Sequence, residues 1–414
     1  MIDSTLKYLF QLHNRGIKLG LENINKILHE CNNPHDKFQA IHLAGTNGKG
    51  STASIIAKIL QNTGQKVGLY TSPHLINFNE RIRIDGIPIS NTDIINFTKT
   101  YRDFFEKHSI TFFEATTAMA FDYFKKNEVD IAIVETGLGG RLDSTNVLSP
   151  IHTIITEIDF DHTHLLGETV EEITAEKCGI IKNATPNTTI NTKSNIVEVI
   201  DRFSIKKNTK TNYINKDHIN LCEHKTNMLH LEYNDSNYIL PQAGSFQAEN
   251  AVLAIETIKN EFKDINHIQI QAGLDKWFWP GRMQQMEEDI FYDVAHNSSG
   301  VNILTSDLFH IFNQKPIGLV VIKNDKIRPK IISLFENAFE ELIISTIPSK
   351  DILSKDDIKL VKSLEHYQFI ENLNDALRLL KNKQFDGPKV IFGSHYIAKY
   401  VYEFFDFSFD KGNI

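Results

Sequence analysis

The chain has 414 residues, of which 41% are hydrophobic, and its 44 Lys and Arg against 52 Asp and Glu give a formal net charge of −8. That acidic balance argues against a dedicated nucleic-acid binder, whose surface is usually basic. No stretch of about 18 apolar residues offers a membrane span, and the three scattered cysteines lack the spacing of a disulfide framework. We therefore expect a cytoplasmic protein, and its length predicts two domains.

Short apolar runs alternate with amphipathic segments along most of the chain. We expect strands at residues 41–44, 66–71, 130–135, 152–156, 290–294, 316–322, 342–345 and 389–392. We expect helices at residues 48–62, 116–126, 169–181 and 372–383. This alternation predicts an α/β protein with mainly parallel sheets. The polar stretch 183–240 breaks the rhythm and predicts antiparallel strands or long loops, and the alternation that resumes near 285–292 predicts domains at 1–288 and 289–414.

A glycine-rich segment, Gly45-Thr46-Asn47-Gly48-Lys49-Gly50-Ser51, lies between the first expected strand and the helix after it. Its backbone N–H groups, the helix N-terminus and Lys49 would together bind an anion such as a phosphate. Ser51 would offer a hydroxyl to Mg²⁺. The alternative is a plain turn that carries a solvated lysine, but a strand before the segment and a helix after it favour the phosphate loop.

Polar residues stand at or after the ends of four of the expected strands: Ser72, Glu135, His162 and His296. Because ligands of open parallel sheets bind beyond the carboxyl ends of the strands, we expect these residues to share one cleft. Glu135, Ser72 and His162 have the donor types that Mg²⁺ or Mn²⁺ takes beside phosphates. The alternatives are a salt bridge for Glu135 and a capping or surface role for His162.

A capping-box pattern at Thr169 and Glu172 predicts a helix start, and Lys177 falls on the apolar stripe of that helix. A buried lysine must find a partner or lose its proton. The ordinary interpretation is a lysine whose amine reaches a carboxylate elsewhere in the fold. The alternative is a neutral amine that reacts with CO₂ to form a carbamate, which would act as a metal-binding carboxylate.

The glycine segment and several later motifs together resemble the folylpolyglutamate synthase and dihydrofolate synthase family of the Mur ligase superfamily. The later motifs are Glu176-Lys177-x-Gly179-Ile180-Ile181, Gly244 to Asn250, Trp279-Pro280-Gly281-Arg282 and Asp293-Val294-Ala295-His296-Asn297. Phe246 stands where the family usually has histidine. The matches extend over nearly the whole chain and resemble the bifunctional type.

The resemblance implies a parallel-sheet N-terminal ATP-binding domain with a folate pocket, like the central domain of Mur ligases, and a smaller Rossmann-like C-terminal domain. It implies an ATP-dependent ligase that adds L-glutamate to dihydropteroate, to reduced folate polyglutamates, or to both, through an acyl phosphate. A monofunctional folylpolyglutamate synthase, a cell-wall Mur ligase acting on a UDP-linked sugar acid and a non-catalytic ATP-binding switch are the alternatives. The implied cofactors are ATP, one or two Mg²⁺ ions, K⁺ and a carbamylated Lys177, and we expect a monomer.

The resemblance also assigns roles to individual residues. Catalysis would involve Lys49, Arg81, His162, Lys177 and His296. ATP would contact residues 45–51, Asn250 through adenine, Arg282 through phosphate and Asp293 through ribose. Metal would be held by Ser51, Ser72, Glu135, His162 and Lys177. The substrates would contact Ser72, His74, Arg81, Phe113, Arg141, Asp143 and Ser394, although Phe113 is equally well explained as a core residue.

Overall fold

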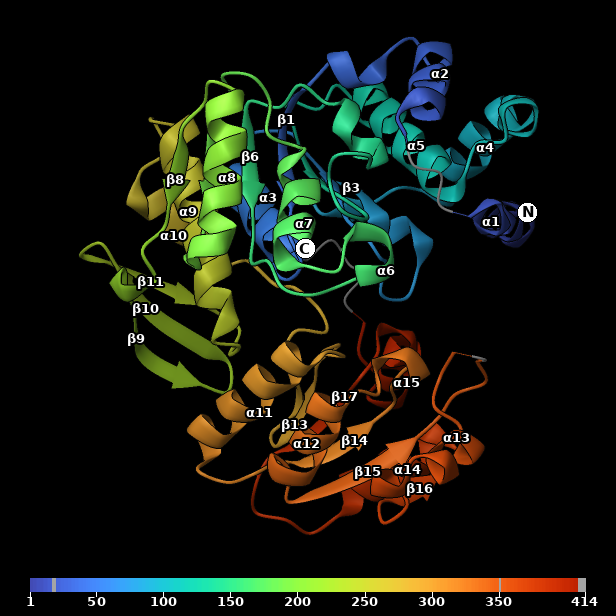
Figure 1. Cartoon of the computed structure of the whole chain (residues 1–414), viewed down its shortest axis with the longest axis vertical. Coiled ribbons are helices and arrows are strands. Elements are labelled where there is room, and N and C mark those ends of the chain that lie inside the picture. The colour runs from blue at the N-terminus through green and yellow to red at the C-terminus, as the bar shows by residue number, and fades with distance from the viewer. Residues whose placement is uncertain (17–19, 350, 409–414) are drawn as a thin grey trace.

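The computed structural model describes residues 1–16, 20–349 and 351–408, which form two α/β domains that follow one another along the chain (Figure 1). The first domain is built on an eight-stranded sheet and the second on a six-stranded sheet. In the described residues, no helix is both long enough and apolar enough to cross a membrane.

The eight-stranded sheet has the order β4-β3-β2-β5-β1-β6-β7-β8. Its strands are β1 (Gln39–Ala44), β2 (Val67–Tyr70), β3 (Ile82–Ile84), β4 (Ile87–Pro88), β5 (Ile131–Glu135), β6 (His152–Ile155), β7 (Asn187–Thr189) and β8 (Thr211–Tyr213). In this order, all adjacent strands from β2 onward to β8 pair in parallel. The β2–β3 and β3–β4 pairs are antiparallel. The carboxyl ends of β2, β5, β1 and β6 therefore meet at one edge.

Helices cover both faces of this sheet, and alternate residues of β5 show why. Ile131 and Ile133 pack with the core that includes α3 (Lys49–Asn62) and α9 (Phe246–Glu261). Ala132 and Val134 pack with the opposite core, which includes α5 (Phe112–Lys126). The remaining helices of this part are α1 (Ile2–Gln11), α2 (Glu22–Glu30), α4 (Asn91–His108), α6 (Thr163–Leu166), α7 (Val170–Cys178), α8 (Ser194–Lys206) and α10 (His267–Leu274).

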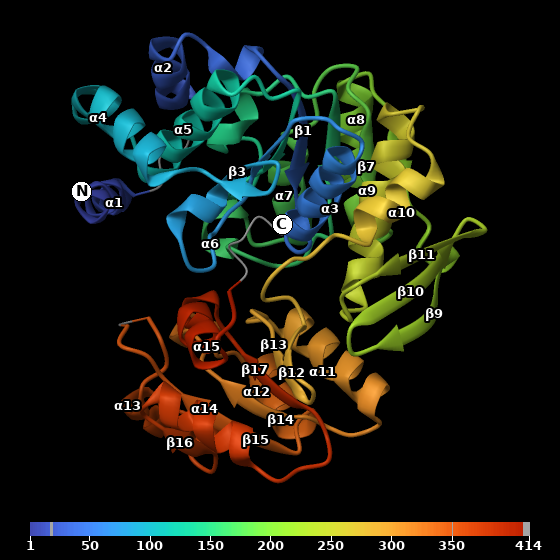
Figure 2. The same ribbon diagram turned by 180° about the vertical axis from the view of Figure 1, so that it is seen from behind.

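The six-stranded sheet has the order β12-β13-β17-β14-β15-β16 and lies below the first sheet in Figures 1 and 2. Its strands are β12 (Gln284–Glu287), β13 (Ile290–Tyr292), β14 (Ile317–Val320), β15 (Glu341–Ser345), β16 (Gln368–Ile370) and β17 (Lys389–Phe392). Its helices are α11 (Ser298–Phe312), α12 (Pro329–Asn337), α13 (Lys355–Leu360), α14 (Leu373–Asn382) and α15 (Ala398–Phe404). Apart from the β12–β13 pair, all adjacent strands of this sheet pair in parallel, as in a Rossmann-like domain.

The structure adds two details to the predicted organisation. The polar stretch 183–240 does contain an antiparallel sheet, β9 (Ile219–Lys225), β10 (Met228–Tyr233) and β11 (Ser236–Leu240), but its first part continues the α/β pattern through β7, α8 and β8. The apolar residues Ile196, Val199 and Ile200 give α8 a buried face at helical spacing that the polar composition hid. The predicted division between residues 288 and 289 would cut the β12–β13 hairpin, so the change of sheet lies before Gln284.

Two glycines allow the loop after β5 to press on the end of α7. A Cβ on Gly140 would lie 2.7 Å from the carbonyl oxygen of Lys177, and one on Gly179 would lie 2.4 Å from the Cα of Arg141. The N–H of Arg141 donates to the carbonyl of Glu176 across this contact, at 2.7 Å. Backbone approach this close fixes where α7 ends and therefore where Lys177 is held.

We predict that Gly179→Ala destabilises the fold, because the added methyl group would collide with the Arg141 backbone, which cannot rotate away. Overpacking of this kind costs about 1–3 kcal/mol, and chemical denaturation would measure it. A midpoint equal to that of the wild type would show that the loop and α7 are not held together at this contact.

Candidate functional site

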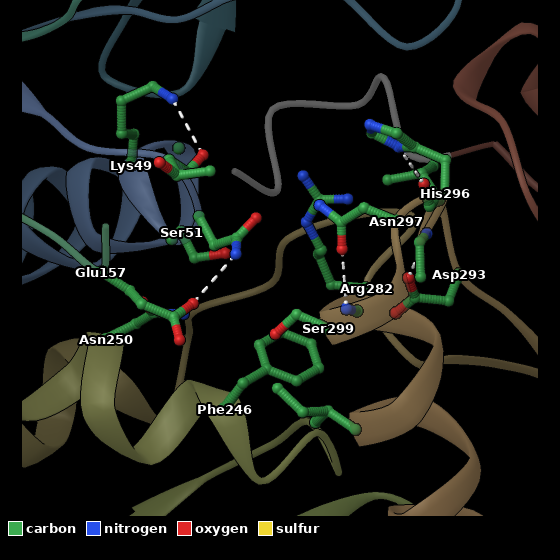
Figure 3. Close-up of a pocket in the computed structure, with 18 of the residues that line it drawn as sticks. Lys49, Ser51, Glu157, Phe246, Asn250, Arg282, Asp293, His296, Asn297 and Ser299 are labelled. Atoms are coloured by element: carbon green, nitrogen blue, oxygen red, sulfur yellow. Dashed lines mark hydrogen bonds between the residues drawn. The ribbon is translucent and has the colours of Figure 1, made fainter. Parts of the chain in front are cut away.

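A cavity of about 740 Å³ opens between the two sheets and is lined by both halves of the chain (Figure 3). The predicted residues in its wall are Thr46, Asn47, Gly48, Lys49, Gly50, Ser51, Ser72, Glu135, His162, Asn250, Arg282, Asp293, His296 and Ser394. The four strand-end residues expected to share a cleft are all among them. Gly45, His74, Arg81, Phe113, Arg141, Asp143 and Lys177 lie outside this wall.

The glycine loop is held in shape by contacts that a side chain would block. Gly48 has φ +85, in the left-handed region that favours glycine, and a Cβ there would lie 2.2 Å from Oδ1 of Asn250. The loop is anchored to the segment after β6, where the N–H of Thr46 donates to the carbonyl of Glu157 at 2.7 Å. Helix α3 begins at Lys49, so its N-terminal N–H groups face the cavity beside the loop.

Two lysines from different elements donate to the carbonyl oxygen of Gly45. Lys177 Nζ does so from α7 at 2.7 Å, and Lys49 Nζ does so at 3.0 Å while also reaching the carbonyl of Thr46 at 3.2 Å. Lys49 Nζ also lies 3.9 Å from Oε1 of Glu135. The loop therefore concentrates positive charge around one carbonyl, which suits it to bind an anion.

The prediction that Lys177 is buried on the apolar face of α7 is confirmed, since it is only 3% exposed. Thr169 caps the helix through the predicted capping box with Glu172. Burial, reinforced by the positive charge of Lys49, lowers the pKa of Lys177 to about 7. The amine is therefore neutral in a large fraction of molecules at physiological pH, as nucleophilic attack on CO₂ requires.

The oxygen donors beside the loop fit a magnesium ion shared with phosphates. Glu135 is buried at the end of β5, and its Oε2 accepts from the N–H of Ser72 at 3.0 Å. Burial raises the pKa of Glu135, while Lys49 opposes that rise. Within the described ranges no group of three or more His, Cys, Asp or Glu could hold a metal. Mg²⁺ needs no such cage, because it commonly takes one or two protein ligands and completes its shell with phosphates and water.

His162 lines the cavity and is the most exposed of the five predicted metal ligands. Its side chain is 47% exposed, and its Nε2 lies 3.6 Å from Oδ2 of Asp161. Burial is the main cause that lowers the pKa of His162, which favours the neutral imidazole that binds metal. Asp161 also lies 3.6 Å from Nζ of Lys326, which joins the two halves of the chain.

The C-terminal wall brings Arg282, Asp293 and His296 to face the glycine loop (Figure 3). Nδ1 of His296 donates to the carbonyl of Val294 at 2.9 Å, which leaves Nε2 free to accept a proton. Both carboxylate oxygens of Asp293 accept backbone N–H groups, from Met283 and from Ala295, each at 2.6 Å. Asp293 therefore organises the two loops that carry Arg282 and His296, besides bordering the cavity as predicted for a ribose contact.

Asn250 has a different environment from the one predicted. Its Nδ2 donates to Oε1 of Gln247 at 2.9 Å, and its Oδ1 accepts from Oγ1 of Thr52 at 3.4 Å. Both ends of the amide are engaged and Oδ1 lies against Gly48, so the side chain braces the glycine loop. The contact with adenine stays a prediction. Phe246, one helical turn earlier, lies with its ring toward the cavity (Figure 3) and offers a flat apolar surface there.

His74 and Arg81 belong to an aromatic and cationic cluster beside the cavity, whereas Phe113 packs against Tyr70, at 6.1 Å between ring centroids. Nε of Arg81 donates to Nδ1 of His74 at 2.8 Å, and its guanidinium lies 5.3 Å from the ring centroid of Phe112. Burial, then Arg81, lowers the pKa of His74 to about 3. The sequence analysis missed two members from the N-terminal helices: Phe10 lies 6.2 Å from His74 and His13 stacks on Phe112 at 3.9 Å, both between ring centroids.

The predicted substrate contacts of Arg141 and Asp143 are not supported by the geometry. Arg141 points to the outside and pairs with Glu176 at 2.8 Å. Asp143 is buried and accepts from the N–H groups of Gly137 and Leu138 and from the N–H and hydroxyl of Thr145. Its oxygens shape the loop after β5, and the contact of Asp143 with substrate stays a prediction.

The cavity also holds charged residues that the sequence analysis did not single out. Lys216 pairs with Glu249 at 2.8 Å beside the apolar residues Ile219 and Leu221 of β9. Lys323 and His395 line the C-terminal side. Lys323 and His395 each follow a predicted strand, so the strand-end argument that found His296 applied to them too.

The comparisons with known proteins agree with this site. Residues 43–258 match the Mur ligase middle domain. A dihydrofolate synthase/folylpolyglutamate synthase of Bacillus subtilis is 33% identical over 400 residues, which cover 90% of this chain and 92% of the relative. The chain belongs to the dihydrofolate synthase/folylpolyglutamate synthase family. It is therefore an ATP-dependent ligase, as its resemblance to this family predicted.

Solved structures of the family confirm the predicted fold. The folylpolyglutamate synthase of Thermotoga maritima is 32% identical, with a TM-score of 0.85 over 97% of both chains. That of Mycobacterium tuberculosis complexed with ADP is 28% identical, with a TM-score of 0.88 over 98% of this chain and 99% of that one. Both likenesses extend over nearly the whole chain, so they include both sheets and the cavity between them.

We predict that Lys177→Met changes how stability depends on pH. The pKa of Lys177 falls from 10.5 to about 7 on folding, so above pH 7 the unfolded chain binds more protons and the folded state gains stability as pH rises. In CO₂-free buffer, the free energy of unfolding of the wild type should rise relative to that of the variant from pH 7 to 10, by at most about 1.4 kcal/mol per pH unit. Parallel curves for the two proteins would contradict the lowered pKa.

Proposed function

We propose that this ligase adds L-glutamate to 7,8-dihydropteroate and to reduced folate polyglutamates. The observation that carries the proposal is the division of the cavity: the glycine loop with Lys49 lies on one wall, and Arg282 and His296 face it from the other. A triphosphate held by the loop would have its outer phosphate between the two sets of cations. A carboxylate substrate placed there meets both the phosphoryl group and a base.

The chemistry requires two steps, because an amine does not displace an oxide from a carboxylate. In the first step a carboxylate oxygen of the folate substrate attacks the γ-phosphorus of ATP, which gives an acyl phosphate and ADP. In the second step the amine of glutamate attacks the acyl carbon, loses a proton and expels inorganic phosphate. Lys49 and Arg282 neutralise the phosphate oxygens in both steps. His296, with Nε2 free, is placed to take the proton from the amine.

The residues beside the loop fit the cofactors that the family resemblance implies. Ser51 and Glu135 would hold Mg²⁺ together with phosphate oxygens, and Ser72 and His162 border the same space. When bound, Mg²⁺ supplies charge neutralisation and fixes the phosphate geometry. The neutral amine of Lys177, buried under the loop, suits carbamate formation, in which it attacks CO₂ and releases a proton. The family resemblance alone implies K⁺ as a further cofactor.

The folate substrate would bind where the aromatic cluster adjoins the cavity. Pro73 and Gly137 lie in the cavity wall, and the ring of Phe113 lies directly on Gly137, where a Cβ would come within 2.4 Å of it. The flat ring of Phe113 offers a stacking surface for a pterin, whereas Phe112 is buried and already covered by His13. Cys31, Cys178 and Cys222 are free thiols, which suits the reducing cytoplasm, where we propose that the ligase acts as a monomer.

The experiment that tests the proposal measures phosphate release from ATP with Mg²⁺ and L-glutamate, with 7,8-dihydropteroate, tetrahydrofolate or no acceptor. We expect glutamate-dependent release with both acceptors. Release with tetrahydrofolate alone would restrict the enzyme to polyglutamate extension. Release with neither acceptor would contradict the proposal and point to UDP-linked sugar acids or to an ATP-binding switch.

We also predict that Lys177→Ala abolishes ligation while ATP still binds, because the phosphate loop keeps its other contacts. Calorimetric titration with a non-hydrolysable ATP analogue would measure binding separately from turnover. Lys182→Ala is a control, since Lys182 also donates to a backbone carbonyl, that of Asn146, but is only partly buried and lies outside the cavity. Ligation by Lys177→Ala at the rate of the control would remove the carbamate from the proposal.

A further inference from the structure

Loop 241–245, which leads from β11 into α9, is held between the two domains by groups that the ligation chemistry does not use. Ala243 belongs to the first domain, but it is buried in the hydrophobic core of the second, together with Leu308 of α11. Two residues later, the N–H of Ser245 donates to Oδ2 of Asp307, also of α11, at 2.8 Å. Apolar packing and a hydrogen bond therefore both attach the loop across the domain boundary.

Asp307 depends on this contact, because it is only 6% exposed. A carboxylate that is buried without donors is costly. Burial raises the pKa of Asp307, whereas Ser245 and the nearby His224 and His310 oppose that rise. Groups of both domains thus stabilise the ionised carboxylate.

Two histidines add a second attachment of the same loop. Nε2 of His224, on β9, donates to the carbonyl of Ala243, which can only accept. The ring of His224 stacks on the ring of His310 of α11, with 5.4 Å between their centroids. The loop is therefore held on either side of Gly244, by β9 through the carbonyl of Ala243 and by α11 through the N–H of Ser245.

The next residue, Phe246, connects this loop to the cavity. Its ring lies directly on Gly244, where a Cβ would come within 2.4 Å of it. The ring also packs against the hydrophobic core of the second domain, and it lies toward the cavity between α9 and α11 (Figure 3). A shift of Ser245 relative to Asp307 would therefore move this wall of the cavity.

The substrate that meets this wall is the nucleotide. Asn250 follows Phe246 by one turn of α9, and its Oδ1 lies against Gly48 of the glycine loop. Helix α9 therefore extends from the loop held by Asp307 to the loop that would hold the triphosphate. A nucleotide with its phosphates at the glycine loop has its remaining part within reach of the Phe246 ring.

We propose that Asp307 is a positioning residue for ATP, which holds loop 241–245 across the domain boundary and thereby fixes the cavity wall that ATP meets. The inference rests on the proposed function only in placing the triphosphate at the glycine loop, and it does not depend on which folate is the substrate. Asp307 lies outside the cavity wall. It forms no covalent bond and moves no proton, so it acts on the affinity for ATP rather than on the ligation step.

The test is steady-state kinetics of the full chain with saturating tetrahydrofolate, L-glutamate and Mg²⁺, with ATP varied. Asp307→Ala should raise the KM for ATP about tenfold, the lower end of what a hydrogen bond to a charged group contributes. The kcat and the KM for tetrahydrofolate should change less than about twofold. Asp307→Asn keeps an acceptor oxygen and should restore most of the affinity. A mere loss of folded enzyme would instead lower kcat and leave the KM for ATP unchanged.

Asp130→Ala is the control for the loss of such a hydrogen bond. Oδ2 of Asp130 accepts the N–H of Lys66, also at 2.8 Å, but this pair is exposed and lies within the first domain, outside the cavity. Its KM for ATP should equal that of the wild type. His224→Leu removes the donor to Ala243 and should act in the same direction as Asp307→Ala, so it decides the inference if Asp307→Ala does not fold. An unchanged KM for ATP in these two variants would overturn the proposal, and so would an equal rise in the KM for tetrahydrofolate.

If the wild type shows no turnover with either folate acceptor, the proposed function fails, and calorimetric titration of a non-hydrolysable ATP analogue with Mg²⁺ then decides the inference. Weaker binding by Asp307→Ala than by Asp130→Ala would support the positioning role. Equal binding by the two variants would overturn it, and so would the absence of binding to the wild type.

Discussion

The carbonyl oxygen of Gly45 is the point on which the ligase site depends, because it accepts hydrogen bonds from Lys177 and Lys49 together. One neutral carbonyl cannot compensate two ammonium groups in a buried place. The excess positive charge is reduced partly because the pKa of Lys177 is lowered. It is also compensated partly by Glu135, which lies 3.9 Å from Lys49. The remaining positive charge is available to phosphates, so a structural contact between α7 and the loop also prepares the loop for its ligand.

The parts of the site that the sequence predicted are those whose position follows from local pattern. Lys177 could be placed on a buried face because its spacing from Val170 and Ile173 is helical. Glu135 and His296 could be placed at one cleft because they follow apolar strands of parallel sheets. Neither inference requires knowledge of distant contacts, which explains why both were confirmed.

The parts that the sequence could not supply depend on which hydrogen bonds a polar group has already made. Asp143 carries the residue type of a substrate contact, yet four donors of its own loop occupy its oxygens. Asn250 is likewise engaged by Gln247 and Thr52. These partners are brought together by the tertiary fold, so a motif shows that such a residue matters without showing whether it binds ligand or shapes the loop. The β12–β13 hairpin escaped prediction for the same reason, since pairing partners decide to which sheet a short strand belongs.

The arrangement of charges also explains why the site needs both domains. The cations that we propose to neutralise a triphosphate are divided between Lys49 in the first domain and Arg282 in the second. Asp161 and Lys326 join the domains by an ion pair of 3.6 Å. The side chains of this pair are about a quarter exposed, so solvent still screens part of their attraction. One hydrophobic cluster contains residues of both sheets and also joins the two domains, and the negative charge of bound substrates, which both walls attract, would add to that contact. An acyl phosphate hydrolyses in water, so a site that is completed only when its substrates are present protects the intermediate at the stage when it exists.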